Sequence, residues 1–565
     1  MAKVLVLGDT LSALAVVRSL GRKDVFVVVG VEDTKAPVLF SRYAKKVVKL
    51  LSFAAEPEKW KELVKDVILK EHPDLVIPAS ESSFVPLCLS REYFSGIAKL
   101  AIPDKSGFER TFFKDQTVSL AKELGVPLPA SFVVHNEKNL EDFFGNFKLK
   151  PPFVAKPVVS KAWQDGYKLE FSAKRIDTAD GAREYARNYL PFASILIQER
   201  FDGVGVGQEL LCKNGEILMA FQHLRLREPE GSGGSSFRKS VPLGERMLEC
   251  SKKLLSALKW TGVVMVEYRK NLATGDFVLL EINGRFWGSL PLAVEAGADF
   301  PYALYKLLVL GERVNIRSYK NDIYVRDLFD DLRFIAKSRG VFSALFGLVL
   351  FEVRFILGLE KRDAFTWSDP LPGLAEFWFI LRSVASLVTS RLFKTISVAF
   401  YRNPKIEDTK KLLEKNRSIL FVCLGNVSRS PFAAAYLKKK LAEKNISGAK
   451  VDSAGLSLKE GRKATPYAKT AAAEYGVDLS NHSSSFLNKE DVESYGLILC
   501  MDFSNYRDIK RKFPAAGEKL FLLDGFNESC REIKDPQGGD PETYRRSLRL
   551  VKDGVDKLFN AKLIS

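Results

Sequence analysis

A cysteine, an arginine and a serine stand close together in the stretch 421–431, FVCLGNVSRSP. An apolar run ends at Cys423, Arg429 follows after five intervening residues, and helical spacing begins at Phe432. A loop leading from a strand into a helix N-terminus favours bound anions and the thiolate form of a cysteine. The planar guanidinium of Arg429 matches phosphate oxygens. These residues predict hydrolysis of a phosphate ester through a phosphocysteine.

Two carboxylates stand at the ends of two neighbouring apolar runs, 263–267 and 277–283. The short polar turn between the runs predicts an antiparallel hairpin. A buried glutamate is unfavourable unless it is paired or bound to a metal. Glu267, Glu281 and the nearby Asn283 together form an all-oxygen ligand set of the kind that suits Mg²⁺.

Three cationic side chains accompany this carboxylate pair. Lys114 opens a predicted helix, Lys156 ends the apolar run of 152–157, and Arg285 follows Asn283 at the same strand exit. A polar loop at 160–167 comes directly after the second lysine. Mg²⁺, lysines and a mobile loop form the set needed to transfer a γ-phosphoryl group.

The elements that must position these residues alternate between strand and helix. In residues 1–100, apolar runs at 3–7, 25–31 and 75–78 alternate with helical patterns, which predicts a doubly wound α/β unit. The turn at Gly8 lacks a GxGxxG pattern, so we predict a plain strand–helix turn and no dinucleotide site. A similar alternation returns in residues 418–562.

Bulk composition limits the functional classes. The 565 residues predict two to four domains, and the net charge of +17 suits phosphorylated ligands, anionic membranes or a lysine-rich solvated surface. No nucleic-acid recognition motif is present, so we expect no nucleic-acid partner. The six cysteines form no CxxC pair and the four histidines are dispersed. This pattern predicts a reducing compartment without a disulfide framework, and we expect a cytoplasmic protein without a signal peptide.

The middle of the chain, 316–416, leaves two alternatives open. Residues 341–359 are apolar apart from Glu352 and Arg354, and residues 374–400 mix aromatic and basic side chains at helical spacing. The first run is marginal for a membrane span. These amphipathic helices either lie on a membrane surface through 341–400 or pack on the preceding domain. A charged linker follows at 401–417.

Residues 1–315 resemble the ATP-grasp superfamily, in its carbamoyl-phosphate-synthase-like carboxylate–amine ligase branch. The segments that carry the resemblance are VAKP at 154–157, QE at 198–199, MVEY at 265–268 and LLEINGRFWGS at 279–289. The resemblance implies ATP and Mg²⁺ (or Mn²⁺) as cofactors. It also implies that a small-molecule carboxylate is activated as an acyl phosphate, which an amine then attacks.

The same resemblance assigns roles to individual residues. It implies phosphate contacts for two lysines, an adenine and ribose hinge, a metal site, and an arginine facing the reacting phosphate. The phosphate contacts would come from Lys114 and Lys156, and the hinge from Gln198, Glu199 and Phe201. The metal site would consist of Glu267, Glu281 and Asn283, and the arginine is Arg285. Arg225, Arg227 and the loop 231–236 are candidates for binding an anionic substrate, with a solvated hairpin tip as the alternative.

The last domain resembles a low-molecular-weight protein-tyrosine phosphatase over its whole length. The motif CLGNVSRSP, the SAG triplet at 453–455 and the late Asp535-Pro536 occur in the family's order. The resemblance implies that Cys423 attacks phosphorus while Arg429 and the loop N–H groups hold the oxygens. It further implies that Ser430 stabilises the thiolate, Asn426 braces the loop, and Asp535 protonates the leaving oxygen.

Two departures from the family pattern affect the expected chemistry. Ser428 stands where many members carry a second cysteine, so Cys423 should lack a protective disulfide. Gln537 replaces an aromatic residue after the Asp-Pro, which weakens the preference for aryl phosphates. Val427 inside the loop is nearer the tyrosine-phosphatase pattern than the threonine of arginine-phosphatase relatives.

Together these observations predict a multidomain α/β protein. The expected parts are a pre-ATP-grasp α/β unit (1–100), an ATP-grasp α+β domain (101–315), an amphipathic helical segment with linker (316–416), and a phosphatase domain with a parallel sheet (417–565). We expect a bifunctional enzyme acting on carboxylate and amine substrates and on a phosphomonoester or a phosphotyrosine protein. The alternative is a regulatory tyrosine phosphatase of a surface-polysaccharide system, with the ATP-grasp part as a binding or tailoring module.

Overall fold

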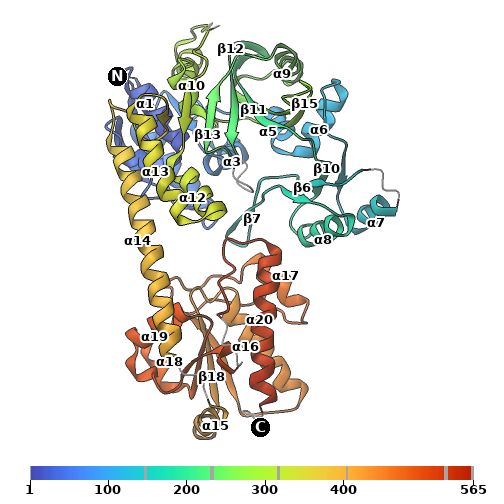
Figure 1. Cartoon of the computed structure of the whole chain (residues 1–565), viewed down its shortest axis with the longest axis vertical. Helices are drawn as coiled ribbons and strands as arrows, with labels where there is room; N and C mark the ends of the chain where they lie inside the picture. The colour runs from blue at the N-terminus through green and yellow to red at the C-terminus, as the bar shows by residue number, and fades with distance from the viewer. Residues whose placement is uncertain are drawn as a thin grey trace. The chain divides into compact units, whose positions relative to one another are not determined.

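A computed structural model of the chain describes residues 2–145, 149–228, 234–314, 318–401, 405–526 and 532–561. The chain divides into two compact units. The first contains Met1–Ala162 and Glu170–Ser383, and the second contains Trp163–Leu169 and Val384–Ser565 (Figure 1). The candidate loop residues 231–233 and Cys530 lie outside the described residues.

The first unit begins with a four-stranded parallel sheet in the order β3-β2-β1-β4. The two central strands are apolar along their length and buried on both faces, as parallel strands between helices must be. The strands are β1 (Lys3–Leu7), β2 (Phe26–Val31), β3 (Ala44–Lys49) and β4 (Leu75–Pro78). The helix α1 (Leu11–Gly21) connects β1 to β2, α2 (Pro57–Glu71) connects β3 to β4, and α3 (Glu81–Leu89) follows β4.

Two further sheets follow in the same unit. The smaller has the order β5-β10-β6-β9 and consists of Ser131–Val134, Ile195–Glu199, Phe153–Pro157 and Lys174–Ile176. Helices α7 (Glu137–Gly145) and α8 (Ala179–Tyr189) pack on it through an apolar core. The hairpin β7 (Lys161–Gln164) and β8 (Tyr167–Glu170) forms a separate two-stranded sheet, of which Trp163–Leu169 belong to the second unit.

The larger sheet has seven strands in the order β15-β14-β11-β12-β13-β16-β17. In that order the strands are Phe277–Asn283, Gly262–Lys270, Val204–Lys213, Glu216–Arg227, Phe237–Ser240, Tyr324–Arg326 and Lys361–Arg362. The expected antiparallel hairpin is confirmed, since β14 and β15 pair with Glu267 opposite Glu281. Helices α5 (Lys105–Phe112), α6 (Lys114–Glu123) and α9 (Glu245–Ala257) accompany this sheet, and α10 (Leu290–Glu295) and α11 (Phe300–Tyr305) follow it. The strands β16 and β17 lie beyond residue 315, so part of the middle segment extends this sheet.

Buried ion pairs join the middle segment to earlier parts of the first unit, and the helices of the segment share a small apolar core of their own. Its helices are α12 (Leu328–Arg339), α13 (Val341–Ile356) and α14 (Leu371–Phe400). Ala344 and Phe351 of α13 share an apolar cluster with α12 and with Ile380 of α14. Arg18 of α1 binds Asp369 at 2.9 Å, and Arg238 of β13 pairs with Asp363. No helix among the described residues is both long and apolar enough to cross a bilayer.

The second unit is a doubly wound parallel α/β domain with the strand order β19-β18-β20-β21 (Figure 1). Its strands are β18 (Ser418–Cys423), β19 (Lys450–Gly455), β20 (Leu497–Cys500) and β21 (Leu520–Leu522). Side chains of β18 alternate between two cores, because successive residues of a strand point to opposite faces. One core contains α16 (Arg429–Glu443), α17 (Pro466–Ala473) and α20 (Pro541–Asn560), and the other contains α18 (Lys489–Ser494) and α19 (Phe503–Lys512). A further helix, α15 (Ile406–Lys415), precedes β18. The expected α/β fold class is confirmed.

Candidate active sites

The nucleophile loop connects the end of β18 to the start of α16. Cys423 is buried at the end of the strand, and its Sγ lies 3.0 Å from Ser430 Oγ. The backbone N–H of Asn426 donates to the same sulfur at 3.2 Å. The sulfur is thus held by one side-chain contact and one backbone contact at the N-terminus of α16. The structure therefore brings Cys423, Asn426 and Ser430 together as expected.

Asn426 holds the loop in its tight shape. Its φ of 50° is in the left-handed region, where Asn is tolerated better than most residues. Its Nδ2 donates to Ser430 Oγ at 3.0 Å and to Ser453 Oγ at 2.9 Å. A side chain at Gly455 would meet the Cβ of Asn426 at 3.0 Å, so this position of the SAG triplet favours glycine. His482 contacts the carbonyl of Asn426 at 2.6 Å, and burial lowers the pKa of this imidazole.

Arg429 is buried and held by acceptors from two other elements. One terminal nitrogen donates to Asp502 Oδ2 and to the carbonyl of Ile533, both at 2.8 Å, and the other lies 2.5 Å from Asp535 Oδ2. Burial lowers the pKa of the guanidinium, but the charges of Cys423, Asp535 and Asp502 raise it by more. The arginine therefore stays charged and fixed in orientation beside the thiol.

Asp535 lies close to the nucleophile loop although it is more than a hundred residues away in sequence. Its ion pair with Arg429 places a partly exposed carboxyl group beside the cradle, where a leaving-group oxygen can reach it. Gln537 is exposed, and its N–H donates to Asp535 Oδ1 at 3.2 Å. Ser428 is buried, and its hydroxyl has no hydrogen-bond partner among the described residues.

The carboxylates of the second candidate site converge on one amide. Asn283 Nδ2 donates to Glu267 Oε1 at 3.1 Å and to Glu281 Oε1 at 3.0 Å, and Arg225 binds Glu267 Oε2 at 2.7 Å. Burial raises the pKa of Glu267 to about 7. Burial also acts to raise the pKa of Glu281, but the charges of Lys114 and Lys156 outweigh it and lower the value to about 2.

This donor set fits Mg²⁺ when nucleotide phosphates complete the coordination. Among the described residues, no group of three or more His, Cys, Asp or Glu side chains is placed to hold a metal ion. Mg²⁺ commonly binds proteins through one or two carboxylates, with water and substrate phosphates as the other ligands. Two carboxylates that approach a single polar atom from two sides provide that arrangement.

The two lysines lie close to the carboxylate pair. Lys114, at the start of α6, donates to Ser160 Oγ at 2.8 Å, and Lys156 on β6 lies 3.5 Å from the carbonyl of Leu280. Both are largely buried. Burial lowers the pKa of Lys156 to about 8, against the attraction of Glu281. Buried cations of this kind suit phosphate groups.

The predicted hinge lies on the strand next to Lys156. Gln198 of β10 is two residues from Leu196, which pairs with Lys156, so Gln198 and Lys156 point to the same face of the sheet. The side-chain nitrogen of Gln198 is buried without a partner among the described residues. Glu199 accepts the N–H of Lys150 at 2.7 Å, and Phe201 is half-buried in the following turn.

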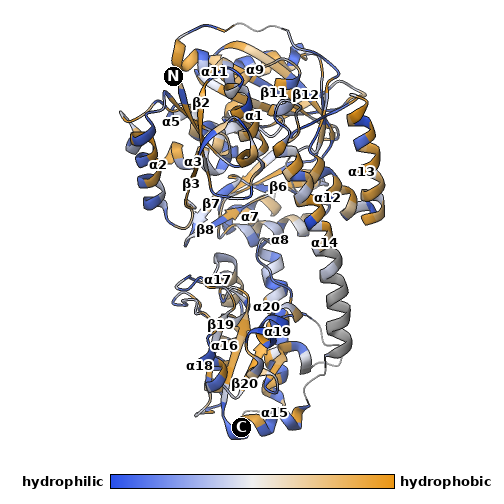
Figure 2. Ribbon diagram, turned by 90° about the vertical axis from the view of Figure 1, so that its left-hand side faces the viewer, coloured by the Kyte–Doolittle hydropathy of each residue, from blue (hydrophilic) through white to orange (hydrophobic). Residues whose placement is uncertain are grey.

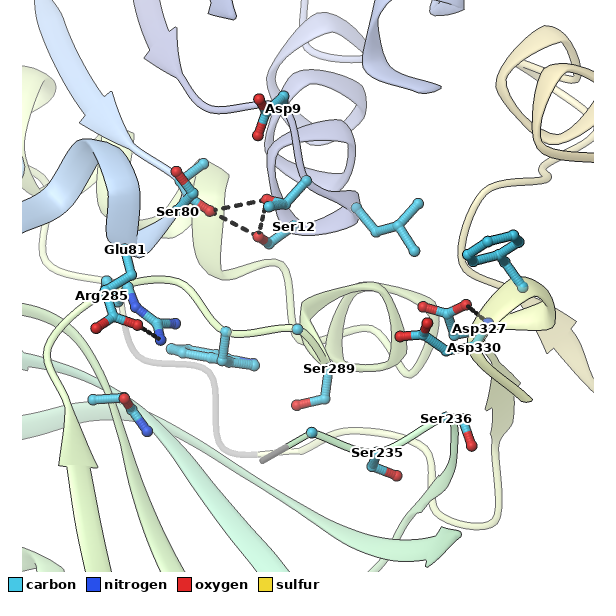
Figure 3. Close-up of a pocket in the computed structure, with 18 of the residues that line it drawn as sticks. Asp9, Ser12, Ser80, Glu81, Ser235, Ser236, Arg285, Ser289, Asp327 and Asp330 are labelled. Carbon is cyan, nitrogen blue, oxygen red and sulfur yellow. Dashed lines mark hydrogen bonds and ion pairs between the residues drawn. The ribbon is translucent and has the colours of Figure 1, made fainter. Parts of the chain in front are cut away.

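A cavity of about 760 Å³ opens beside the carboxylates within the first unit (Figure 3). Of the described residues predicted for this site, Glu267, Glu281, Asn283 and Arg285 line the cavity, whereas the two lysines and the hinge residues do not. Arg285 binds Glu81 at 3.3 Å and so connects the seven-stranded sheet to α3, which follows the first sheet. Arg225 also lines the cavity, and Arg227 instead pairs with Asp331 at 2.6 Å.

Several lining residues were not predicted from the sequence. Asp9 and Ser80 follow β1 and β4, at the carboxyl edge of a parallel sheet where ligands commonly bind. Asp327 and Glu376 come from the middle segment. Burial raises the pKa of Asp327 to about 7 and that of Glu376 well above its usual value. In the second unit, the missed residue is Asp502, which directly follows the strand neighbouring β18.

Two family models match the chain. A model described as "Low molecular weight phosphotyrosine protein phosphatase" matches residues 418–564. A model described as "ATP-grasp in the biosynthetic pathway with Ter operon" matches residues 191–329. The matched ranges contain the nucleophile loop and the carboxylate pair, respectively.

Similar proteins cover one part of the chain each. A protein-arginine-phosphatase from Geobacillus stearothermophilus is 38% identical over 141 residues, which is 25% of this chain and 92% of the relative. A low molecular weight phosphotyrosine protein phosphatase from Sus scrofa is 41% identical over 152 residues, which is 25% of this chain and 96% of the relative. The crystal structure of L-amino acid ligase from Bacillus licheniformis aligns with 55% of this chain and 74% of its own, at 16% identity and a TM-score of 0.42.

Proposed function

We propose that this chain is a bifunctional enzyme. It belongs to the low-molecular-weight phosphotyrosine protein phosphatase family through its C-terminal domain, and it carries an ATP-grasp domain before that domain. The ATP-grasp domain joins a carboxylate to an amine with consumption of ATP. The C-terminal domain hydrolyses a phosphomonoester. Each activity has its own set of residues.

The convergence of Glu267 and Glu281 on Asn283 carries the ligase half of the proposal. These three residues would hold Mg²⁺, which when bound offsets phosphate charge and orients the nucleotide. Lys114 and Lys156 bind phosphate oxygens, and Arg285 faces the acyl group from the cavity. The substrate carboxylate takes the γ-phosphoryl group of ATP, and an amine then attacks the acyl carbon and releases phosphate.

The phosphatase half rests on the distances around Cys423. The thiolate attacks phosphorus while Arg429 and the loop N–H groups stabilise the charge on the equatorial oxygens. Asp535 donates a proton to the leaving oxygen and then accepts one from the attacking water. The exposed Gln537 provides no aromatic wall, so we propose a substrate range that includes small or sugar-like phosphates besides phosphotyrosine proteins.

ATP consumption tests the ligase half. The full chain is incubated with ATP, Mg²⁺ and panels of carboxylates and amines, and ADP release is measured with Glu281→Gln as the matched variant. We expect release that requires both a carboxylate and an amine and that is lost in the variant. Absence of any substrate-dependent release, or equal release by the variant, refutes the assignment.

Hydrolysis of p-nitrophenyl phosphate tests the phosphatase half. Cys423→Ser should abolish it, and unchanged turnover would refute the assigned nucleophile. Comparing wild-type rates on phosphotyrosine peptides and phospho-sugars then separates the two substrate classes. A strong preference for the peptides would favour the regulatory alternative.

A further inference from the structure

The helix α13 carries an apolar face that no described part of the chain covers. Its inner side packs on α12 and α14 through Ala344 and Phe351. On its outer side, large apolar residues recur every three or four positions and are exposed. This stripe, the α13 face, consists of Phe342, Leu345, Phe346, Val349, Val353 and Ile356. Figure 2 shows these hydrophobic stretches along α13 at the margin of the first unit.

The α13 face is free of charge because both charged residues of the helix are paired with the neighbouring segment. Glu352 binds Arg362 at 3.1 Å, and Arg354 binds the buried Glu360 at 3.2 Å. A further exposed aromatic residue lies near the C-terminal end of the helix, away from the stripe. Trp367 is 82% exposed and stacks on Phe355 of α13, with ring centroids 6.3 Å apart.

Exposed charges near this surface are mostly basic, with Asp330 at the start of α12 as an acidic exception. From 331 to 382, a range that the structure describes throughout, every acidic side chain is buried or half-buried. The exposed charged residues of the range are all basic: Arg333, Lys337, Arg339, Lys361 and Arg382. An exposed apolar stripe with aromatic residues and a basic border is the pattern of a helix that lies in the headgroup region of a membrane.

We propose that the α13 face binds the surface of a membrane that contains anionic phospholipids. Phe342 and Phe346 enter the boundary between headgroups and acyl chains, and the basic border contacts lipid phosphates. A second copy of the chain fits this surface less well, because a two-fold contact would bring the basic borders together. The chain lies on the bilayer, in keeping with the absence of a spanning helix among the described residues.

Vesicle co-sedimentation with the full chain tests the proposal. Vesicles of phosphatidylcholine mixed with phosphatidylglycerol are compared with phosphatidylcholine alone, and we expect at least about tenfold stronger binding to the anionic vesicles. The double variant Phe342→Glu with Phe346→Glu should lower this binding at least about tenfold, since the two side chains are 89% and 74% exposed.

The matched control changes two exposed leucines elsewhere in the unit by the same charge. Leu89 and Leu272 are each 61% exposed, and Leu89→Glu with Leu272→Glu should bind like the wild type. Lys337→Gln with Arg339→Gln leaves the apolar face intact and should remove only the preference for anionic vesicles. Thermal midpoints of all variants should match the wild type.

Three results would overturn the proposal. The first is wild-type chain that binds neither kind of vesicle. The second is a Phe342→Glu, Phe346→Glu chain that still sediments with anionic vesicles like its control. The third is a wild-type chain that binds no vesicles but self-associates or binds an acidic protein, with that association lost in the Phe342→Glu, Phe346→Glu variant. This result would show that the α13 face binds a protein.

Discussion

Asp502 offers a test of the phosphatase site, because its contact with the assigned catalytic residues is the ion pair with Arg429. Its Oδ2 accepts from Arg429 at 2.8 Å, while its Oδ1 accepts the N–H of Asn505 at 2.8 Å and caps α19. Asp502→Asn keeps the size and the capping oxygen but removes the charge. The guanidinium then keeps the carbonyl of Ile533 and the carboxylate of Asp535 as partners.

The expected loss follows from that single bond. A hydrogen bond between charged groups contributes about 1.5–3 kcal/mol in proteins. If the guanidinium loses this much orientation in the transition state, kcat/KM should fall about 10- to 100-fold, since each 1.4 kcal/mol is about tenfold. Because the Ile533 carbonyl and Asp535 still hold the guanidinium, the loss in kcat/KM should not exceed the upper end of this range.

Steady-state hydrolysis of p-nitrophenyl phosphate measures the effect. Asp508→Asn is the matched control, because Asp508 lies on the same helix and pairs with Arg507 and Arg511 on the helix surface. The control should retain wild-type kcat/KM, and both variants should keep the wild-type thermal midpoint. An Asp502→Asn chain with unchanged kcat/KM would refute the positioning role.

Three further predictions concern named groups of the two sites. Asp535→Asn should lower kcat by about 10² to 10⁴ on a phosphotyrosine peptide. The loss on p-nitrophenyl phosphate should be smaller, because its leaving group needs little protonation. Equal losses on the two substrates would contradict the role of Asp535 as general acid. After peroxide treatment, dithiothreitol should not restore the activity of the wild type. It should restore the activity of Ser428→Cys, because a disulfide can protect Cys423 in that variant. Recovery of the wild-type activity would contradict the prediction that Cys423 lacks a protecting disulfide. Because burial lowers the pKa of Lys156 to about 8, calorimetry should show ATP affinity that is full below that pH and falls by up to about tenfold per pH unit above it. Lys156→Arg stays charged and should bind ATP with a flatter pH profile, and identical profiles would exclude Lys156 as the titrating group.

Local sequence patterns predicted the elements that carry the chemistry. The strand ending at Cys423 and the hairpin that places Glu267 opposite Glu281 follow from apolar runs, a turn and the position of the polar residue that ends each run. These relations span few residues, so spacing is enough to see them. The parallel sheet of the second unit follows from the same alternation of strand and helix.

Residues that meet across hundreds of positions could not be predicted in this way. Arg18 and Asp369 lie 351 positions apart, and nothing in their own neighbourhoods marks them as a buried pair. Asp327 and Glu376, which line the cavity, belong to the same middle segment as Asp369. Of the two alternatives for the middle segment, packing on earlier parts of the chain is seen in pairs such as Arg18–Asp369, and membrane contact stays a prediction.

The most direct test of two separate activities is a crossed assay on the full chain. Hydroxylamine replaces the amine and captures an acyl phosphate as a hydroxamate, while p-nitrophenyl phosphate reports the second site. We expect Glu281→Gln to lose hydroxamate formation and keep phosphatase turnover, and Cys423→Ser to lose phosphatase turnover and keep ATP-dependent hydroxamate formation. A chain that forms no hydroxamate with any carboxylate, or a single substitution that removes both activities while the fold is retained, would contradict the account.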